Sequence, residues 1–274
     1  AAGVPGGTLS VVWQPREFRR FEACFDTSTG PALVVTDAGR AYVKALGNPE
    51  GPHVLACEWL GTNLARWLGL RTFDFALLNL QPDDDVPLGH GRQATPGPAF
   101  ATRAERGHGW GGDAEELQVV ANKPDLSRMI VLDTWIRNRD RYLPGRRCHV
   151  DNVFLSSENT MGEAREVVVM DHTHCLADVA ELTPRVAARE FVQDERIFGA
   201  FPAFAGFLDL RETAEALHCL ASFDAETASA LVAALPPAWE VNEATRDALS
   251  RFLVERSRWL SSREPSLFRP DQTG

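Results

Sequence analysis

The chain has 274 residues, of which 44% are hydrophobic, so it is long enough to bury a large core and to form two lobes. Its formal net charge of −10 argues against nonspecific binding to nucleic acid or to an anionic membrane as its main role. No apolar run reaches about 18 residues, so no membrane-spanning helix is predicted. The five cysteines lie far apart without a Cys-x-x-Cys pair, and the N-terminus has no signal-peptide pattern. We therefore expect reduced thiols and a cytoplasmic location.

The first candidate site along the chain is the polar turn formed by Thr27, Ser28, Thr29 and Gly30, immediately before the first predicted strand. Backbone N–H groups and hydroxyls in such a turn can bind phosphate oxygens. The segment lacks the G-x-x-x-x-G-K-[ST] nucleotide loop and the G-x-G-x-x-G pattern of protein kinases, so an ordinary turn is the alternative.

Lys44 is the second candidate. Residues 32–46 split into two strand-like runs around a hairpin turn, and Lys44 lies near the end of the second run. Lys44 and Lys123 are the only lysines among 28 basic residues, so a lysine within a strand is unusual here. Its flexible ammonium suits contact with phosphate oxygens. The alternative is an edge-strand lysine on a solvated face.

Glu58 is a candidate partner for Lys44. It begins the segment Glu58–Leu70, in which Leu60, Leu64 and Leu68 recur at helical spacing. A glutamate on such a helix can form the ion pair that directs a strand lysine toward nucleotide phosphates. An ordinary surface carboxylate is the alternative.

Two Pro- and Gly-rich stretches, residues 80–98 and 105–117, are predicted loops. Residues 99–103 between them form either a strand or a connector. We expect the chain to divide near this point.

Residues 132–176 carry the strongest functional signal. A helix opened by Pro124 leads to a loop with Asp140, and two short apolar strands around a polar hairpin separate Asn152 from Asp171. ATP-dependent phosphotransferases use one loop acid to orient a hydroxyl, and an amide oxygen and a later Asp to bind Mg²⁺. The order of these residues predicts Asp140 as the catalytic acid, with Asn152 and Asp171 as metal ligands.

These segments resemble the HipA-like kinase family, which is distantly similar to the phosphatidylinositol 3- and 4-kinases and to the serine/threonine kinase toxin HipA. The resemblance covers residues 25–176 and is most specific in "YVKA…GNPEG", "EWLGTNLARWLGL" and "WIRNRDR…DNVFL…MDH". It implies an α+β, two-lobed protein-kinase-like fold. The β-rich small lobe, residues 1–105, would bind nucleotide phosphates, and the larger, mostly helical lobe, residues 106–274, would be catalytic. Residues 99–103 would then be the last strand of the small lobe or the connector near the adenine. It also implies ATP with Mg²⁺, and transfer of the γ-phosphoryl group to a hydroxyl on a protein Ser/Thr or a small molecule. The matching positions carry the family roles: phosphate-binding Lys44, its partner Glu58, catalytic Asp140, and metal-binding Asn152 and Asp171.

One departure from the family pattern concerns the catalytic loop. Asn152 follows Asp140 by twelve positions, whereas a spacing of about five is usual. A surface loop tolerates an insertion of about seven residues at small entropic cost, so the site can survive. The insertion also allows Asp151 to share the work of Asp140, or a changed substrate, or an inactive enzyme. Several arginines crowd this loop, and they bind an acidic or phosphorylated substrate, stabilise charge on the transferred group, or simply form a solvated basic loop: Arg137, Arg139, Arg141, Arg146 and Arg147.

Beyond Leu176, four stretches show helical apolar spacing: residues 185–201, 211–223, 225–235 and 242–260. Two other functions remain open. The first is a nucleotide-binding pseudokinase that acts by docking a partner. The second is a metal-dependent phosphohydrolase built on a His/Asp cluster: His149, Asp151, Asp171, His172 and His174.

Overall fold

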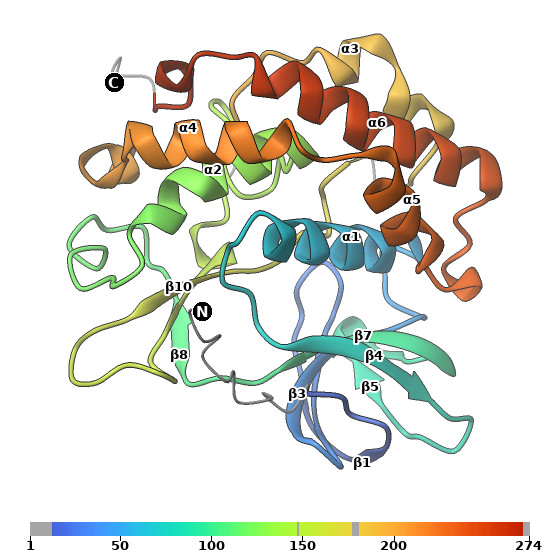
Figure 1. The fold of residues 1–274 in the computed structure, drawn as a ribbon. Coiled ribbons are helices and arrows are strands. Elements are labelled where there is room, and N and C mark those ends of the chain that lie inside the picture. Colours follow the sequence, from blue (N-terminus) through green and yellow to red (C-terminus); the bar gives the residue numbers. More distant parts are fainter. Residues whose placement is uncertain (1–12, 147, 177–180, 271–274) are drawn as a thin grey trace, which may run out of the picture.

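The computed structural model describes residues 13–146, 148–176 and 181–270. Its N-terminal part is a five-stranded antiparallel sheet of order β1-β2-β3-β7-β4 (Figure 1). The strands are β1 (Phe18–Cys24), β2 (Ala32–Thr36), β3 (Gly39–Lys44), β4 (Phe75–Leu80) and β7 (Gly97–Arg103). A short ribbon of β5 (Pro87–Leu88) and β6 (Arg92–Gln93) accompanies them.

The predicted hairpin of residues 32–46 is confirmed as β2 and β3, and Lys44 is the last residue of β3. Strand β1 was not predicted, so the polar turn at Thr27 joins β1 to β2 instead of preceding the first strand. Two register shifts interrupt the pairing of β1 with β2, and they disturb the strict alternation by which a strand is recognised in a sequence.

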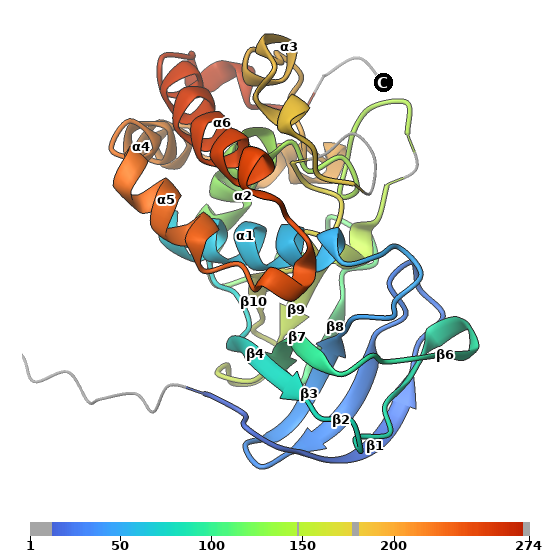
Figure 2. The same ribbon diagram turned by 90° about the vertical axis from the view of Figure 1, so that its right-hand side faces the viewer.

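Helix α1 (His53–Trp67) lies between the sheet and the C-terminal helices (Figures 1 and 2). It begins five residues before Glu58, so Glu58 is an interior residue of the helix and is buried. Trp59 packs its ring edge-on against Phe75 of β4, at 5.5 Å between centroids, and against Trp239 at 6.5 Å. The helix is therefore fixed to both parts of the molecule.

The C-terminal part is mostly helical. The predicted helix opened by Pro124 and three of the four predicted tail helices are confirmed: α2 (Pro124–Ile136), α4 (Leu210–Leu220), α5 (Ala225–Ala233) and α6 (Glu243–Ser261). The side chains of Asp209, Asp224 and Asn242 cap the last three by accepting hydrogen bonds from first-turn N–H groups. This part also contains a small sheet of order β10-β9-β8, formed by β8 (Gly107–Gly109), β9 (Val153–Ser156) and β10 (Glu166–Val169).

The prediction of one helix over residues 185–201 is wrong. Only α3 (Arg189–Val192) and a 3₁₀ turn at Pro184–Ala187 form there. The buried Arg256 of α6 donates hydrogen bonds to the carbonyls of Phe191, Val192 and Asp194, at 2.9 to 3.1 Å. The guanidinium therefore satisfies carbonyls that have no N–H partner further along a helix.

The α+β fold with an antiparallel N-terminal sheet and a helical C-terminal part is thus the predicted one. Residues 99–103 form most of β7, the last strand of the sheet in chain order. The core of α1 belongs to the same buried cluster as α2, so a lobe boundary at residues 105–106 stays a prediction. Within the described ranges, no helix combines the length and apolarity needed to cross a bilayer.

Candidate active site

A cavity of about 500 Å³ lies between the five-stranded sheet and the small sheet. Lys44, Phe100 and Thr102 line it from the first sheet, and Phe154 and Asp171 line it from the second. Glu58, Asn152 and Asp151 border the same space. The structure therefore gathers five predicted site residues at one cavity: Thr27, Lys44, Glu58, Asn152 and Asp171.

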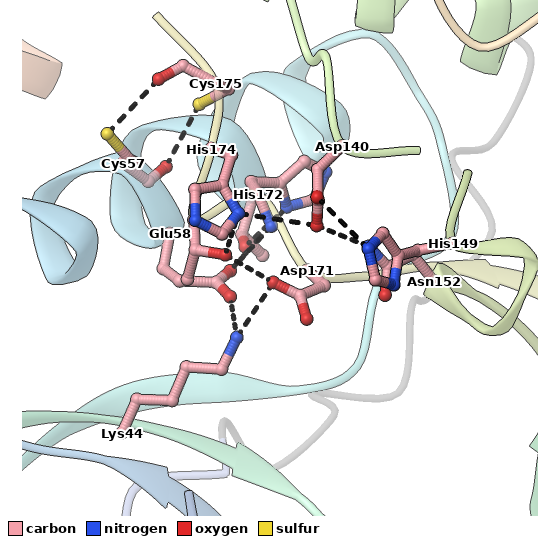
Figure 3. A network of polar contacts seen from close by, with 12 residues as sticks. Lys44, Cys57, Glu58, Asp140, His149, Asn152, Asp171, His172, His174 and Cys175 are labelled. Carbon is pink, nitrogen blue, oxygen red and sulfur yellow. Dashed lines mark hydrogen bonds and ion pairs between the residues drawn. The ribbon is translucent and has the colours of Figure 1, made fainter. Parts of the chain in front are cut away.

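Lys44 contacts two carboxylates at the inner end of this cavity (Figure 3). Its Nζ pairs with Oε1 of Glu58 and lies 3.0 Å from Oδ1 of Asp171. Glu58 is 2% exposed, and its other oxygen accepts the backbone N–H of His172 at 3.1 Å. The two alternatives from the sequence are therefore excluded: Lys44 is not an edge-strand lysine on a solvated face, and Glu58 is not a surface carboxylate.

The β9–β10 hairpin places Asn152 and Asp171 together. Asn152 precedes β9, Asp171 follows β10, and the pairing of Val153 with Val169 brings these two ends side by side. Asp171 has a left-handed backbone with φ of 58°, which Asp tolerates better than most residues. Thr173 donates to its Oδ1 at 2.7 Å, which fixes the carboxylate.

Charge partners stabilise the ionised forms of this centre. Burial opposes ionisation of Lys44, but the carboxylates of Asp171 and Glu58 outweigh it and raise the pKa of the lysine. Burial likewise opposes the charge on Asp171, yet Lys44 and the Thr173 hydroxyl hold its pKa well below the ordinary value. The cavity therefore presents a fixed cation and a fixed anion at neutral pH.

Asp140 lies next to Asn152 despite the insertion. The Asn152 amide donates to Oδ2 of Asp140 at 3.2 Å. His174 Nδ1 is 3.3 Å from the same oxygen, and His149 Nε2 is 3.6 Å from the other. Burial raises the pKa of Asp140, but His174 and then His149 outweigh burial and lower it. The carboxylate is thus ionised at neutral pH.

Two of the loop arginines are structural. Arg141 is fully buried, pairs with Oδ2 of Asp133 at 2.7 Å and donates to the Asn152 carbonyl. Arg137 is 1% exposed and pairs with Asp194 at 3.0 Å. Neither sequence-based interpretation of the basic loop therefore holds for these two. Arg147 lies outside the described residues.

The four residues of the Thr27–Gly30 turn differ in their exposure and in whether they reach the cavity. Thr27 lines the cavity and Ser28 is exposed, whereas Thr29 and Gly30 are buried. Gly89 donates its N–H to the Gly30 carbonyl at 3.0 Å, and a Cβ on Gly30 would lie 2.9 Å from the Gly89 nitrogen. Of this set, Thr27 therefore lines the cavity, and Ser28 is the other residue that is not buried.

Sequence reasoning missed the segment that holds this turn. The His90 N–H donates to Oδ1 of Asp26 at 2.6 Å, and its ring lies 2.8 Å from the Thr27 carbonyl. His90 has φ of 59° between two glycines, and the sequence predicts only a loop over this Gly-His-Gly string. The short string of glycines around a histidine was the one available signal.

The residues present fit a magnesium ion with nucleotide phosphates. Asp171 Oδ2 and Asn152 Oδ1 accept no hydrogen bond from the described residues, and both residues border the cavity. Mg²⁺ takes one or two protein oxygens and completes its shell with phosphates and water. In contrast, no three His, Cys, Asp or Glu side chains among residues 13–146, 148–176 and 181–270 form a group that could hold a metal alone.

Asp140 also borders a second hollow, of about 400 Å³, with Arg139, Arg146, His149 and His174. The cavity that contains Lys44 does not include Asp140 among its lining residues. Asp140 therefore stands between the two spaces, with Asn152 on the side of the first. Asp151 is exposed and borders only the first cavity.

The fold and this cleft define a protein of the protein-kinase-like class. The chain matches the HipA-like kinase family over residues 19–263, and it therefore belongs to that family. Membership supports kinase activity at the level of the family. No curated protein sequence matches the chain.

One similar solved structure is the crystal structure of a Helicobacter pylori proinflammatory kinase, CtkA. The TM-score is 0.57 at 13% identity, and the match covers 90% of this chain and 96% of that chain. At this identity the similarity supports the fold alone.

Proposed function

We propose that this protein transfers the γ-phosphoryl group of ATP to a hydroxyl acceptor, on a protein Ser/Thr or on a small molecule. The observation that carries the proposal is the contact of Lys44 with both Glu58 and Asp171 at one cavity. A lysine fixed by a helix glutamate, facing an aspartate beside an amide, is the arrangement that positions nucleotide phosphates.

In this proposal, Lys44 contacts the phosphates of ATP, and the N–H groups of Thr27 and Ser28 contact them from the turn between β1 and β2. Asn152 and Asp171 hold Mg²⁺, which neutralises charge on the phosphates when bound. Asp140 accepts the proton of the acceptor hydroxyl, which enters through the second hollow. The attacking oxygen bonds to the γ-phosphorus as the bond to the β-phosphate oxygen breaks, and ADP leaves.

The alternatives have less support. The insertion leaves Asp140 and Asn152 in contact, so nothing in the described loop favours a pseudokinase. A phosphohydrolase would need several metal ligands grouped together. His172 is instead buried, with its Nδ1 3.3 Å from the Thr62 hydroxyl, and no such group forms among the described residues.

The five cysteines are free, which suits a reducing compartment such as the cytoplasm.

The test uses γ-labelled ATP with Mg²⁺ and the whole protein, offered protein and small-molecule hydroxyl acceptors. We expect label transfer that Asp140→Asn abolishes. A protein that binds Mg·ATP but transfers no label would support the pseudokinase. Stabilisation by Mn²⁺ or Zn²⁺ without nucleotide, together with phosphate-ester hydrolysis, would support the phosphohydrolase.

A further inference from the structure

His174 connects the small-lobe loop after β3 with the catalytic carboxylate across the cleft. Its Nε2 lies 2.8 Å from Oε2 of Glu50, and its Nδ1 lies 3.3 Å from Oδ2 of Asp140 (Figure 3 shows the contact with Asp140). Glu50 comes from the β3–α1 connection, whereas Asp140 follows α2. One imidazole ring thus contacts two segments that lie far apart in the sequence, with strands β4 to β8 between them.

The loop that carries Glu50 has a fixed shape. The buried Asn48 amide donates to the carbonyls of Ala45 and Gly51, each at 2.9 Å, and its Oδ1 accepts the Glu50 N–H at 2.9 Å. Thr95 donates its backbone N–H to the Leu46 carbonyl at 2.8 Å. Such side-chain-to-backbone bonds hold a short loop in one conformation. Glu50 is therefore presented to His174 by a supported loop.

The charges on this triad are complementary. The contacts with Asp140 and then Glu50 raise the pKa of His174 to about 10, although burial opposes the charge. His174 is consequently an imidazolium at neutral pH, paired by charge with the carboxylates of Glu50 and Asp140. An imidazolium between two carboxylates has one preferred orientation, and it restricts the rotation of the Asp140 carboxylate as well.

We propose that Glu50 and His174 are positioning residues that orient Asp140 toward the acceptor. The inference rests on the proposed phosphoryl transfer. Neither residue lines the cavity that contains Lys44. Their effect should therefore fall on the chemical step and not on nucleotide binding.

The experiment compares Glu50→Gln, His174→Ala and the double variant in steady-state phosphoryl transfer. We expect kcat to fall by roughly 10- to 100-fold in each single variant, because a misplaced acid costs rate without weakening binding. KM for ATP and the thermal shift with Mg·ATP should stay at wild-type values. Since Glu50 acts through His174, Glu50→Gln should add nothing in the His174→Ala background.

The matched control is Glu116→Gln. Glu116 pairs with His108 at 3.1 Å, and its exposure of 29% is close to the 22% of Glu50, but the pair lies outside the site. This variant should keep kcat unchanged. Because Glu50→Gln is an isosteric change at a partly exposed residue, it remains informative even if His174→Ala does not fold.

A second readout does not depend on turnover. The imidazole of His174, followed by NMR, should stay protonated to about pH 10 in the wild type and titrate at lower pH in Glu50→Gln. An ordinary titration near pH 6.5 in the wild type, or additive losses of kcat, would overturn the inference while leaving the kinase proposal intact. A wild type without phosphoryl transfer would instead refute the proposed function, and the positioning role with it.

Discussion

At the scale of single residues, Lys44 gives the strongest test of the site, because its ammonium pairs with the carboxylates of both Glu58 and Asp171. Lys44→Ala should lower kcat/KM by roughly 100-fold or more, the scale expected for loss of one preorganised charge. Glu58→Gln should cause a smaller loss, since it weakens only the placement of Lys44. Steady-state phosphoryl transfer measures both, and near-wild-type turnover of Lys44→Ala would exclude the assignment.

The two acids that flank the insertion can be separated by substitution. Asp140 contacts Asn152, His149 and His174, whereas Asp151 is exposed at the rim of the nucleotide cavity. Asp140→Asn should abolish transfer and leave the affinity for Mg·ATP nearly unchanged, and Asp151→Asn should retain most activity. Nucleotide binding and label transfer are measured on both variants. If Asp151→Asn is the more damaging change, the two roles must be exchanged.

The buried pair of Arg141 and Asp133 makes a prediction about stability. Arg141→Met leaves the fully buried Asp133 without its guanidinium, and breaking a buried pair costs about 3–5 kcal/mol. The control is Arg103→Met, which breaks an exposed pair with Asp74 that is worth about 0–1 kcal/mol. Urea unfolding compares the midpoints. Equal losses in the two variants would show that Arg141 does not support the loop.

At the scale of elements, α1 and the Asp171 segment touch at a glycine. A Cβ on Gly61 would lie 2.4 Å from the Cβ of His172, so the two backbones approach as closely as they do only because position 61 has no side chain. This contact keeps Glu58 of α1 within reach of the His172 N–H.

Gly61→Ala should therefore destabilise the protein by about 1–3 kcal/mol through overpacking, even though alanine is the better helix former. It should also lower activity, because the Asp171 segment must shift. Gly206→Ala, where no atom lies within 4 Å of the added Cβ, is the control. Thermal unfolding and phosphoryl transfer measure the effect, and a stabilised, active Gly61→Ala protein would contradict it.

The elements also show what the sequence could reveal. Apolar periodicity located α2 and α4 to α6, and the hairpin pattern located β2, β3, β9 and β10, because these signals are local. Arg256 binds the carbonyls of Val192, the last residue of α3, and of Asp194 beyond it. Arg256 lies far from both in sequence, so apolar periodicity alone predicts a longer helix. The order of Asp140, Asn152 and Asp171 could be recognised in the sequence. The contact of Glu50 with His174 and the burial of Arg141 could not, because they arise from tertiary packing.

At the scale of the whole molecule, nucleotide binding should be visible as stabilisation of both halves at once. Mg·ATP at 100 times its dissociation constant adds roughly 2.7 kcal/mol, enough to raise the unfolding midpoint by several degrees. ATP or Mg²⁺ alone should have little effect, since the metal shares its ligands with the phosphates.

Differential scanning fluorimetry measures these shifts. Asp171→Asn should remove most of the Mg²⁺-dependent part of the shift while the protein still folds. Asp113→Asn, an exposed acid away from the cleft lining, serves as the control. A wild type that shows no shift with Mg·ATP would contradict the nucleotide site.

The scarcity of lysine has a practical consequence. Of the two lysines, Lys44 is ion-paired at the cavity, and the partly exposed Lys123 donates to the Gln118 carbonyl at 2.7 Å. A reagent that acylates ε-amines therefore meets two side chains in very different surroundings. Because acylation needs the neutral amine and two carboxylates raise the pKa of Lys44, we expect the label almost entirely on Lys123, and labelling of Lys44 would report loss of its ion pairs without any engineered probe.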